Sequence, residues 1–478
     1  MTNKVARNTL YLTGASIGQK IIAFIYFLFL ARIMMPEQTG QYFLAISITS
    51  IFSVIADFGI TSVITREIAK DEMQARSLVS NAISLKIILT ITAVAVTLIA
   101  SYFLHYGSTI QFLIFLASLV LVLDAFQVFF YGILRGFQSL EFESLGVFVG
   151  MLTTALFGGF ILWFYPSLPL LVVALVLGSF VNVIVSLIHV ARHMGWNVLI
   201  PSLNKKDLSW LLKAAFPFAL AAIFVKIYSY VDTIFISKFL DPASLGFYAI
   251  AYKFTYAFQF LPMAFVAALY PGMSALVDKD PNALEAVLSR SMWYVAVISA
   301  PIVFGLYAIA SEVVQLAGPE YVSATVVLQV LIFVLIPIFL DFPIGSLLNA
   351  SNRQSIKTTI MGVTMIINVF LNAILIPRIG IIGAAYASLF SFLFMFLVGF
   401  YFIRSVIPNF SHWGLLKTLL PIYTSGIIML MAVLILKPIL GWIFVIPVGG
   451  VIYLFFLLFL GVFTESDKSF FKFKRHRV

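Results

Sequence analysis

The chain contains no cysteine, and only 10% of its 478 residues are charged. The absence of cysteine excludes disulfides, thiolate nucleophiles and thiolate metal sites. No GxxxxGK[ST] phosphate-binding loop is present, which argues against an ATP-driven pump. Neither a cofactor nor a metal site is therefore predicted. The five histidines lie without the spacing of metal ligands: His105, His189, His193, His412 and His476.

Apolar residues dominate instead, at 62% of the chain, whereas a soluble domain carries roughly 25% charged residues. The apolar runs are about 20 or more residues long and do not alternate, which predicts helices rather than a barrel. The expected fold class is an all-α polytopic membrane protein with about fourteen spans. The predicted spans are 10–33, 38–64, 78–104, 110–134, 144–164, 168–191, 211–237, 243–270, 289–310, 323–349, 356–376, 381–403, 414–436 and 440–463.

The first span shows no small-residue cleavage site, so we expect it to be retained. Of the 29 lysines and arginines, 21 fall on the side of the N-terminus if the spans alternate in direction, 4 fall on the opposite side, and 4 lie within spans. Because cytoplasmic loops carry the excess of basic residues, both termini are predicted to be cytoplasmic, as in a multi-pass protein of the cell inner membrane. The same distribution accounts for the net charge of +10 without a nucleic-acid partner.

An internal repeat appears at a fixed offset of 206 residues. It aligns a Pro-x3-Gly-x-Tyr-x2-Ala turn, Pro36 to Ala45, with Pro242 to Ala251, and it aligns Lys20 with Lys226. Six spans separate the copies, so both have the same orientation. This predicts two six-helix bundles as parallel pseudo-twofold repeats, followed by two C-terminal helices, with a site near the midplane between spans one, two, seven and eight.

The repeat also predicts the domain boundaries. The expected division is an N-lobe with spans 1–6 at 1–195, a cytoplasmic inter-lobe linker at 196–210, a C-lobe with spans 7–12 at 211–405, two further spans at 406–463, and a basic cytoplasmic tail at 464–478.

Several short motifs resemble the polysaccharide or oligosaccharide flippases (Wzx type) of the multidrug/oligosaccharidyl-lipid/polysaccharide exporter superfamily. They are Arg7-Asn8, Ala31-Arg32, Gly40-Gln41-Tyr42, Asp57-Phe58-Gly59, Leu212 to Pro217, Tyr230-Val231-Asp232, Gly246 to Lys253 and Gly380 to Ala387. Each motif is weak alone, but together with the span pattern they cover nearly the whole chain. The resemblance implies two bundles facing each other in a V, and transfer of an undecaprenyl-pyrophosphate-linked oligosaccharide from the inner to the outer leaflet.

Charges inside spans are expensive, at roughly 2.5–3.5 kcal/mol each on insertion scales. Lys20, Lys226 and Lys253 therefore stand out as candidate substrate-binding residues, because ammonium groups suit a lipid pyrophosphate or an acidic sugar. Tyr230 and Tyr256 accompany them as candidate lining residues. The alternative is that each lysine pairs with an aspartate and only holds helices together.

Three aspartates are candidates for a coupling-ion site, for protons or sodium, or for structural pairs. Asp232 is six residues from Lys226, about 120° around the helix, so Lys253 or a residue of span one is its expected partner. Asp57 lies near the cytoplasmic end of span two. Asp124 begins a polar stripe with Gln127, Tyr131 and Arg135, for which helix–helix hydrogen bonding is the alternative.

The sequence thus predicts a non-enzymatic alternating-access flippase for surface polysaccharide (O-antigen, capsule or exopolysaccharide) biosynthesis in the cell envelope. Its expected partners are the lipid-linked oligosaccharide, the bilayer, and a polysaccharide polymerase and glycosyltransferases. Two other classes stay open. A multidrug efflux antiporter of the same superfamily would be expected to favour buried carboxylates over lysines. A polymerase would need a large reactive outer loop, while a scaffold role is not excluded.

Overall fold

The computed structural model describes residues 2–277 and 279–463, without the side chains of residues 2–13, 15, 16, 72–75 and 266–268. The predicted basic tail at 464–478 and the side chains of the Arg7-Asn8 motif lie outside the described residues. Within them every regular element is a helix, which confirms the all-α fold class. The long helices are α1 Thr2–Asp57, α2 Ile60–Lys70, α3 Glu72–Phe103, α4 Ser108–Gly136, α5 Leu140–Phe164, α6 Leu168–Met194, α7 Lys205–Phe239, α8 Pro242–Tyr256, α9 Phe260–Leu276, α10 Pro281–Ala308, α13 Leu335–Ala350, α14 Gln354–Ile379, α15 Ile381–Tyr401, α16 His412–Leu440 and α17 Trp442–Phe459.

Shorter helices complete the described chain. They are η1 Trp196–Leu199, η2 Ala257–Gln259, α11 Ala310–Val314, η3 Gln315–Ala317, η4 Pro319–Ser323, α12 Ala324–Leu331, η5 Ile332–Val334 and η6 Phe402–Ser405.

The described helices include 12 that are long and apolar enough to span a membrane, or 13 if the bent pair Pro242–Phe265 and Leu269–Leu276 forms one span. The helix α1 contains a break at Met35, whose φ of 63° and ψ of 168° are not helical, and Pro36 follows. Divided there, α1 corresponds to the first two predicted spans. The described helices then form 13 spans, or 14 if the bent pair is one span, which is consistent with the predicted number of about fourteen.

The end of the second predicted span differs from the prediction. The sequence suggested one helix over 38–64, but Phe58 and Gly59 have φ of 45° and 76° and end α1 at Asp57. After this turn α2 is a separate amphipathic helix that buries Ile60, Val63, Ile64 and Ile68. A Cβ at Gly59 would lie 2.6 Å from the carbonyl oxygen of Ala215, so close packing on α7 requires glycine at this turn.

By contact density the chain divides into two compact units. Unit 1 comprises Met1–Ala249 with Met365–Ala384, and unit 2 comprises Ile250–Thr364 with Ala385–Val478. These two units differ from the predicted N-lobe at 1–195 and C-lobe at 211–405. The predicted lobes therefore stay predictions. Each unit is described separately below.

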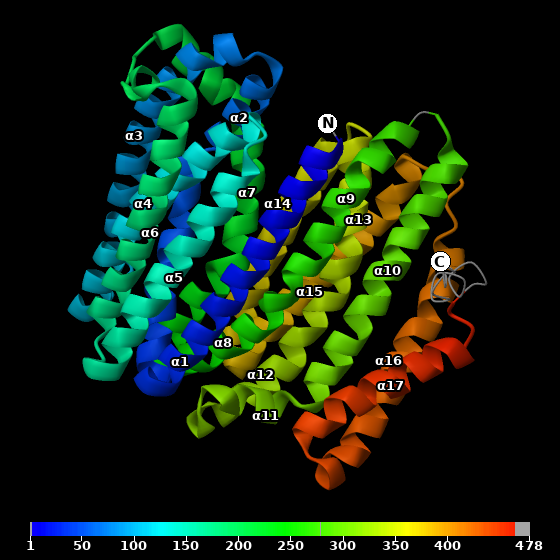
Figure 1. Cartoon of the computed structure of the whole chain (residues 1–478). Coiled ribbons are helices and arrows are strands. Elements are labelled where there is room, and N and C mark those ends of the chain that lie inside the picture. The colour runs from blue at the N-terminus through cyan, green and yellow to red at the C-terminus, as the bar shows by residue number, and fades with distance from the viewer. Residues whose placement is uncertain (1, 278, 464–478) are drawn as a thin grey trace, which may run out of the picture. The chain divides into compact units, whose positions relative to one another are not determined.

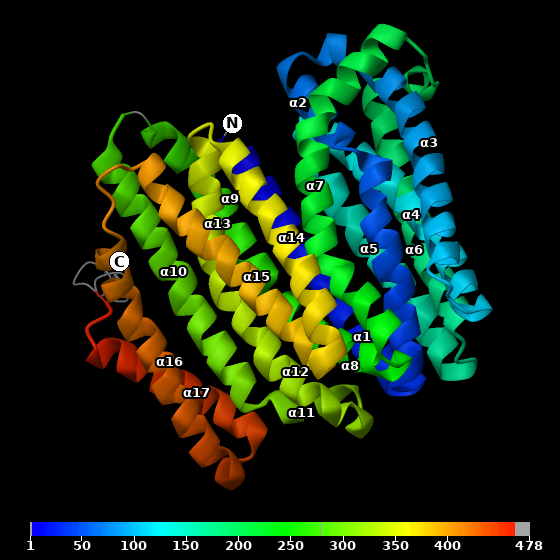
Figure 2. The same ribbon diagram turned by 180° about the vertical axis from the view of Figure 1, so that it is seen from behind.

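In unit 1, helices α3 to α6 lie side by side (Figures 1 and 2). At the end of these helices near α2 a buried apolar cluster joins α2, α3, α4, α6 and α7, including Ile64, Ile83, Phe129, Met194 and Leu211. The amphipathic α2 closes this cluster, as expected for a helix with one apolar face. In unit 2, α10 packs against α9, α13 and α16, and α16 packs against α17 (Figure 2).

Two helix hairpins show the duplication in atomic detail. The turn between α4 and α5 places Gln138 at φ 56°, and the turn between α13 and α14 places Asn352 at φ 57°. In both turns the next residue donates its backbone N–H to the carbonyl oxygen five residues earlier. The distances are 2.9 Å from Ser139 N to Leu134 O and 2.8 Å from Arg353 N to Leu348 O. The two turns are therefore equivalent, at an offset of 214 residues.

This equivalence aligns Glu143 on α5 with Lys357 on α14. Glu143 accepts a 2.7 Å hydrogen bond from Nε of Arg135, while the Lys357 ammonium lies 2.5 Å from Asp341. Each hairpin is thus clamped by an ion pair between its two helices, with opposite polarity in the two copies. The largely buried carboxylate of Asp341 is thus compensated by the ammonium of Lys357 within its own hairpin.

Candidate functional site

The two repeat turns meet directly within unit 1. A Cβ at Gly40 would lie 2.2 Å from the carbonyl oxygen of Pro242, and a Cβ at Gly246 would lie 2.0 Å from that of Pro36. The contact is reciprocal, as expected where two copies of one motif face each other across a twofold axis. We call this contact, between 36–40 and 242–246, the repeat seam. Only glycine at both positions lets the two backbones approach so closely.

Beside the repeat seam, each copy buries a pair of polar side chains. In the first copy the hydroxyl groups of Tyr26 and Tyr42 are neighbours, and both residues are buried. In the second copy the hydroxyl of Tyr248 donates to Asp232, at the positions offset by 206. The second copy therefore has a carboxylate where the first has a phenol.

Asp232 is held by neutral donors. Besides Tyr248, the backbone N–H of Thr233 donates to Oδ1 at 2.8 Å, and the carboxylate is 2% exposed. Among the residues described in unit 1, Asp232 forms no ion pair. Its expected pairing with a lysine therefore stays a prediction, as does its role as a coupling-ion site. The described residues contain no cluster of His, Asp and Glu able to hold a metal ion.

Lys226 lies on α7 in a polar setting. Its ammonium lies 5.7 Å from the centroid of the Tyr230 ring, as the shared helix face of these residues predicts. It also interacts electrostatically with Asp124 on α4, although the two form no direct ion pair in the described part of unit 1. Asp124 in turn accepts a 2.7 Å hydrogen bond from the hydroxyl of Ser179 on α6. The half-buried Lys226 is thus balanced by a more distant carboxylate.

The other predicted binding residues are divided between the units. Lys20 is exposed on α1, which packs against α7 in unit 1. Lys253 belongs to unit 2, where it is half-buried, and Tyr256 of that unit lies 4.3 Å from Tyr252 between ring centroids. The single site formed by all three lysines stays a prediction.

Asp57 has a clear partner. Its Oδ1 lies 2.9 Å from the ammonium of Lys86, which is 0% exposed, and it also accepts from the hydroxyl of Thr61. The Lys86 ammonium lies 5.9 Å from the centroid of the Phe129 ring. The geometry places Asp57 in a structural pair that joins the end of α1 to α3.

We expect Lys86→Met to destabilise the protein strongly, by about 3–5 kcal/mol, because it leaves the carboxylate of Asp57 without its buried partner. Thermal unfolding in detergent measures this change. The double variant Lys86→Met/Asp57→Leu should recover much of the loss. Lys213→Met, at an exposed lysine, is the matched control and should change stability little. An unchanged unfolding temperature for Lys86→Met would contradict the structural assignment.

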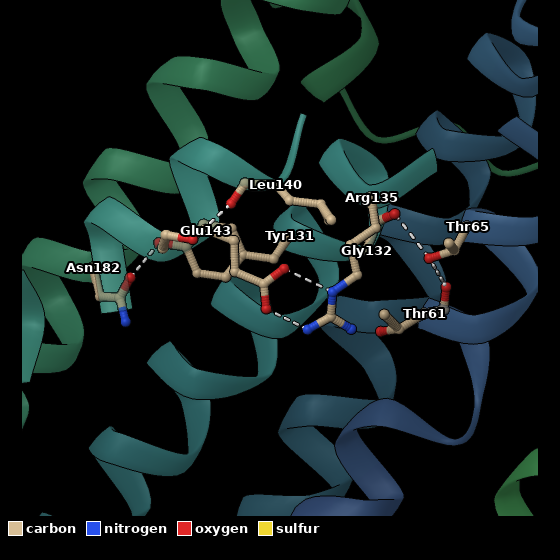
Figure 3. Close-up of polar contacts among 9 residues, drawn as sticks. Thr61, Thr65, Tyr131, Gly132, Arg135, Leu140, Glu143 and Asn182 are labelled. Carbon is tan, nitrogen blue, oxygen red and sulfur yellow. Dashed lines mark hydrogen bonds and ion pairs between the residues drawn. The ribbon is translucent and has the colours of Figure 1, made fainter. Parts of the chain in front are cut away.

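The polar stripe of α4 is used for helix packing. Tyr131 donates to Asn182 on α6, and Arg135 forms the ion pair with Glu143 on α5 (Figure 3). The hydroxyl of Thr65 on α2 donates to the carbonyl oxygen of Gly132 at 2.8 Å. The alternative of helix–helix hydrogen bonding therefore accounts for Tyr131 and Arg135. Asp124 also bonds across helices through Ser179, while its role as a coupling-ion site stays a prediction.

Two residues matter more than the sequence indicated. Lys86 is not among the predicted site residues, and Tyr248 stands in the sequence only as part of the repeated Pro-x3-Gly-x-Tyr-x2-Ala turn. The repeat offset could have revealed Tyr248, since it aligns the pair Tyr26 and Tyr42 with Asp232 and Tyr248. No sequence spacing links Lys86 to Asp57, because their contact depends on the packing of α1 against α3.

The sequence matches known membrane-protein families. Residues 5–277 match the family model described as polysaccharide biosynthesis protein, and residues 217–374 match the MatE model. The chain is 25% identical over 392 residues to the probable low-salt glycan biosynthesis flippase Agl15 of Haloferax volcanii, covering 81% of each chain.

Two solved structures share the fold. An inward closed structure of the lipid II flippase MurJ aligns with a TM-score of 0.77 and 16% identity, over 94% of this chain and 98% of that one. An inward-facing multidrug resistance MATE family transporter aligns with a TM-score of 0.69 and 16% identity, over 82% and 96%. The family match spans more than half of the sequence, and it confirms the resemblance seen in the motifs. The chain belongs to the polysaccharide biosynthesis protein family of the multidrug/oligosaccharidyl-lipid/polysaccharide exporter superfamily.

Proposed function

We propose that this multi-pass membrane protein is a flippase that moves a lipid-linked oligosaccharide across the bilayer by alternating access. The observation that carries this proposal is the family match, read together with positive charge inside a membrane span. Lys226 is only half-buried and its compensating carboxylate is distant, so its ammonium remains available to an anionic headgroup. A diphosphate entering a low-dielectric space gains much from such a charge.

The substrate of the proposal is an undecaprenyl-pyrophosphate-linked repeat unit used for surface polysaccharide such as O-antigen, capsule or exopolysaccharide. The name of Agl15, a probable glycan biosynthesis flippase, supports the substrate class. The headgroup would bind to Lys20 and Lys226 while the polyprenyl chain stays in lipid. Lys253, Tyr230 and Tyr256 would contact the diphosphate or sugar in the same cycle.

The repeat seam supplies the moving part in this proposal. In this proposal the two backbones, which are in direct contact at Gly40 and Gly246, separate and rejoin during the transport cycle. Opening the repeat seam would release the headgroup on its side of the membrane. From the distribution of lysine and arginine we place the repeat seam on the outer side, both termini in the cytoplasm and the protein in the cytoplasmic membrane.

The driving force is proposed to be a proton or sodium gradient acting at Asp232, or removal of the product outside. Asp232 suits an ion site because it is buried, is bonded by neutral donors and has no ion-pair partner among the side chains described in unit 1. A polymerase and glycosyltransferases are the proposed partners, since they would consume and supply the substrate.

A cell lacking its own flippase for lipid-linked oligosaccharide tests the function. Expression of this chain should restore surface polysaccharide, detected by lectin or antibody binding to intact cells. Efflux of a cationic dye, measured in the same cells, tests the antiporter alternative suggested by the MatE match. Restored dye efflux without surface polysaccharide would reject the flippase and favour the antiporter.

A further inference from the structure

The connection between α6 and α7 is hydrogen-bonded to α3. Three residues of the connection and Asp207 in the first turn of α7 take part in these hydrogen bonds. The hydroxyl of Ser80 donates to Ile200 O, that of Ser84 donates to Ser202 O at 2.7 Å, Asn204 N donates to Asn81 Oδ1 at 2.8 Å, and Asn81 Nδ2 donates to Asp207 at 2.9 Å. The backbone of this segment is therefore held in place on unit 1.

The hydrogen bonds also fix the depth of the segment in the bilayer. Near the opposite end of α3, Tyr102 and Phe103 are 71% and 70% exposed, as expected for aromatic residues at a membrane interface. A span of about 20 residues counted back from Phe103 ends at Ser84. The exposed apolar stripe of α3 begins just beyond, at Ile87 and Ile88. The segment bonded to Ser80 and Ser84 thus lies at the second interface of the bilayer.

At that depth the segment exposes large apolar side chains beside basic ones. Trp196, Ile200 and Leu203 are 64%, 62% and 71% exposed, and Trp210 at the start of α7 is 43% exposed. The neighbouring side chains of Arg192, Lys205, Lys206 and Lys213 are exposed as well. Apolar and aromatic groups interleaved with lysine and arginine are typical of segments that lie in the headgroup region of an anionic leaflet.

We propose that the segment from Trp196 to Trp210 is a docking surface for an anionic lipid leaflet, with Ile200 and Leu203 inserted between headgroups and the flanking lysines bound to lipid phosphates. Through this surface the connection between the repeats stays bound to the leaflet while other parts of the chain move. The continuity of the surface with the lipid-facing stripe of α3 favours lipid over a protein partner. This inference does not depend on the transported substrate.

Spin labelling tests the inference, and the chain has no cysteine to remove. The full-length variant Leu203→Cys is labelled and reconstituted in phosphatidylcholine vesicles with or without phosphatidylglycerol. Power saturation compares access of oxygen, which concentrates in lipid, with access of a water-soluble nickel complex. The matched control is Lys70→Cys on the polar face of α2, where the side chain is 61% exposed and its ion pair with Glu67 contributes little.

We expect a several-fold higher oxygen-to-nickel ratio at position 203 than at position 70, and a further rise when phosphatidylglycerol is present. The double variant Lys205→Gln/Lys206→Gln should abolish that further rise and keep the label in lipid. Equal ratios at positions 203 and 70 would overturn the docking surface and show that it faces water. A high oxygen-to-nickel ratio at position 203 that does not change with phosphatidylglycerol would overturn the proposal that the surface binds anionic headgroups.

Discussion

Replacing Gly246 with leucine is expected to abolish transport and to leave the repeat seam open. A Cβ at this position would lie 2.0 Å from the carbonyl oxygen of Pro36, and 2.9 Å from its Cα. Because the obstacle is backbone rather than a flexible side chain, the two repeat turns cannot close around the new residue. A transporter that cannot close on one side cannot complete an alternating-access cycle.

The rate at which a water-soluble reagent reaches the repeat seam tests this prediction. A cysteine introduced at Ser244 should react slowly with a membrane-impermeant maleimide in the otherwise native chain and much faster beside Gly246→Leu. The control is Gly159→Leu on α5 of the same unit, where a Cβ meets nothing within 4 Å. Full transport by Gly246→Leu, or an unchanged labelling rate, would contradict the role of the repeat seam as a gate.

The second large effect is expected for Lys226→Ala, which should reduce surface polysaccharide to the level of cells without the protein. The substitution removes an ammonium that a diphosphate would meet inside the membrane. It also leaves the distant carboxylate of Asp124 with its hydrogen bond from Ser179, so the fold should persist.

Lys417→Ala is the matched control, because this exposed lysine belongs to no proposed site. Protein levels and detergent-extracted size profiles should be the same for both variants. If Lys226→Ala supports normal surface polysaccharide, the lysine is not a substrate-binding residue and only balances Asp124.

The sequence predicted the long helices well because membrane spans depend on length and hydropathy alone. The internal repeat was also predictable, because turns and close backbone contacts restrict the residue types that fit at Pro36, Gly40, Pro242 and Gly246. The repeat they indicated is visible as the repeat seam and, independently, in the matched hairpin turns.

Pairing between charges was much less predictable. Asp57 pairs with Lys86, and Lys226 interacts electrostatically with Asp124, because α1, α3, α4 and α7 pack in a particular rotation. Helical spacing within one span does not specify that rotation. The sequence does not predict the break at Phe58 and Gly59, for a related reason. A run of apolar residues continues through it, and only the close packing of Gly59 on α7 reveals why the helix must stop.

The most direct test of the account is transport by the purified protein in vesicles. A fluorescent polyprenyl-diphosphate oligosaccharide is placed in both leaflets, and a membrane-impermeant quencher reports its movement between them. We predict rapid exchange with the native chain, and exchange no faster than in protein-free vesicles for the double variant Lys20→Gln/Lys226→Gln. Native protein that leaves the lipid in its original leaflet would contradict the proposed flippase. Full exchange by the double variant would contradict the role of the two lysines.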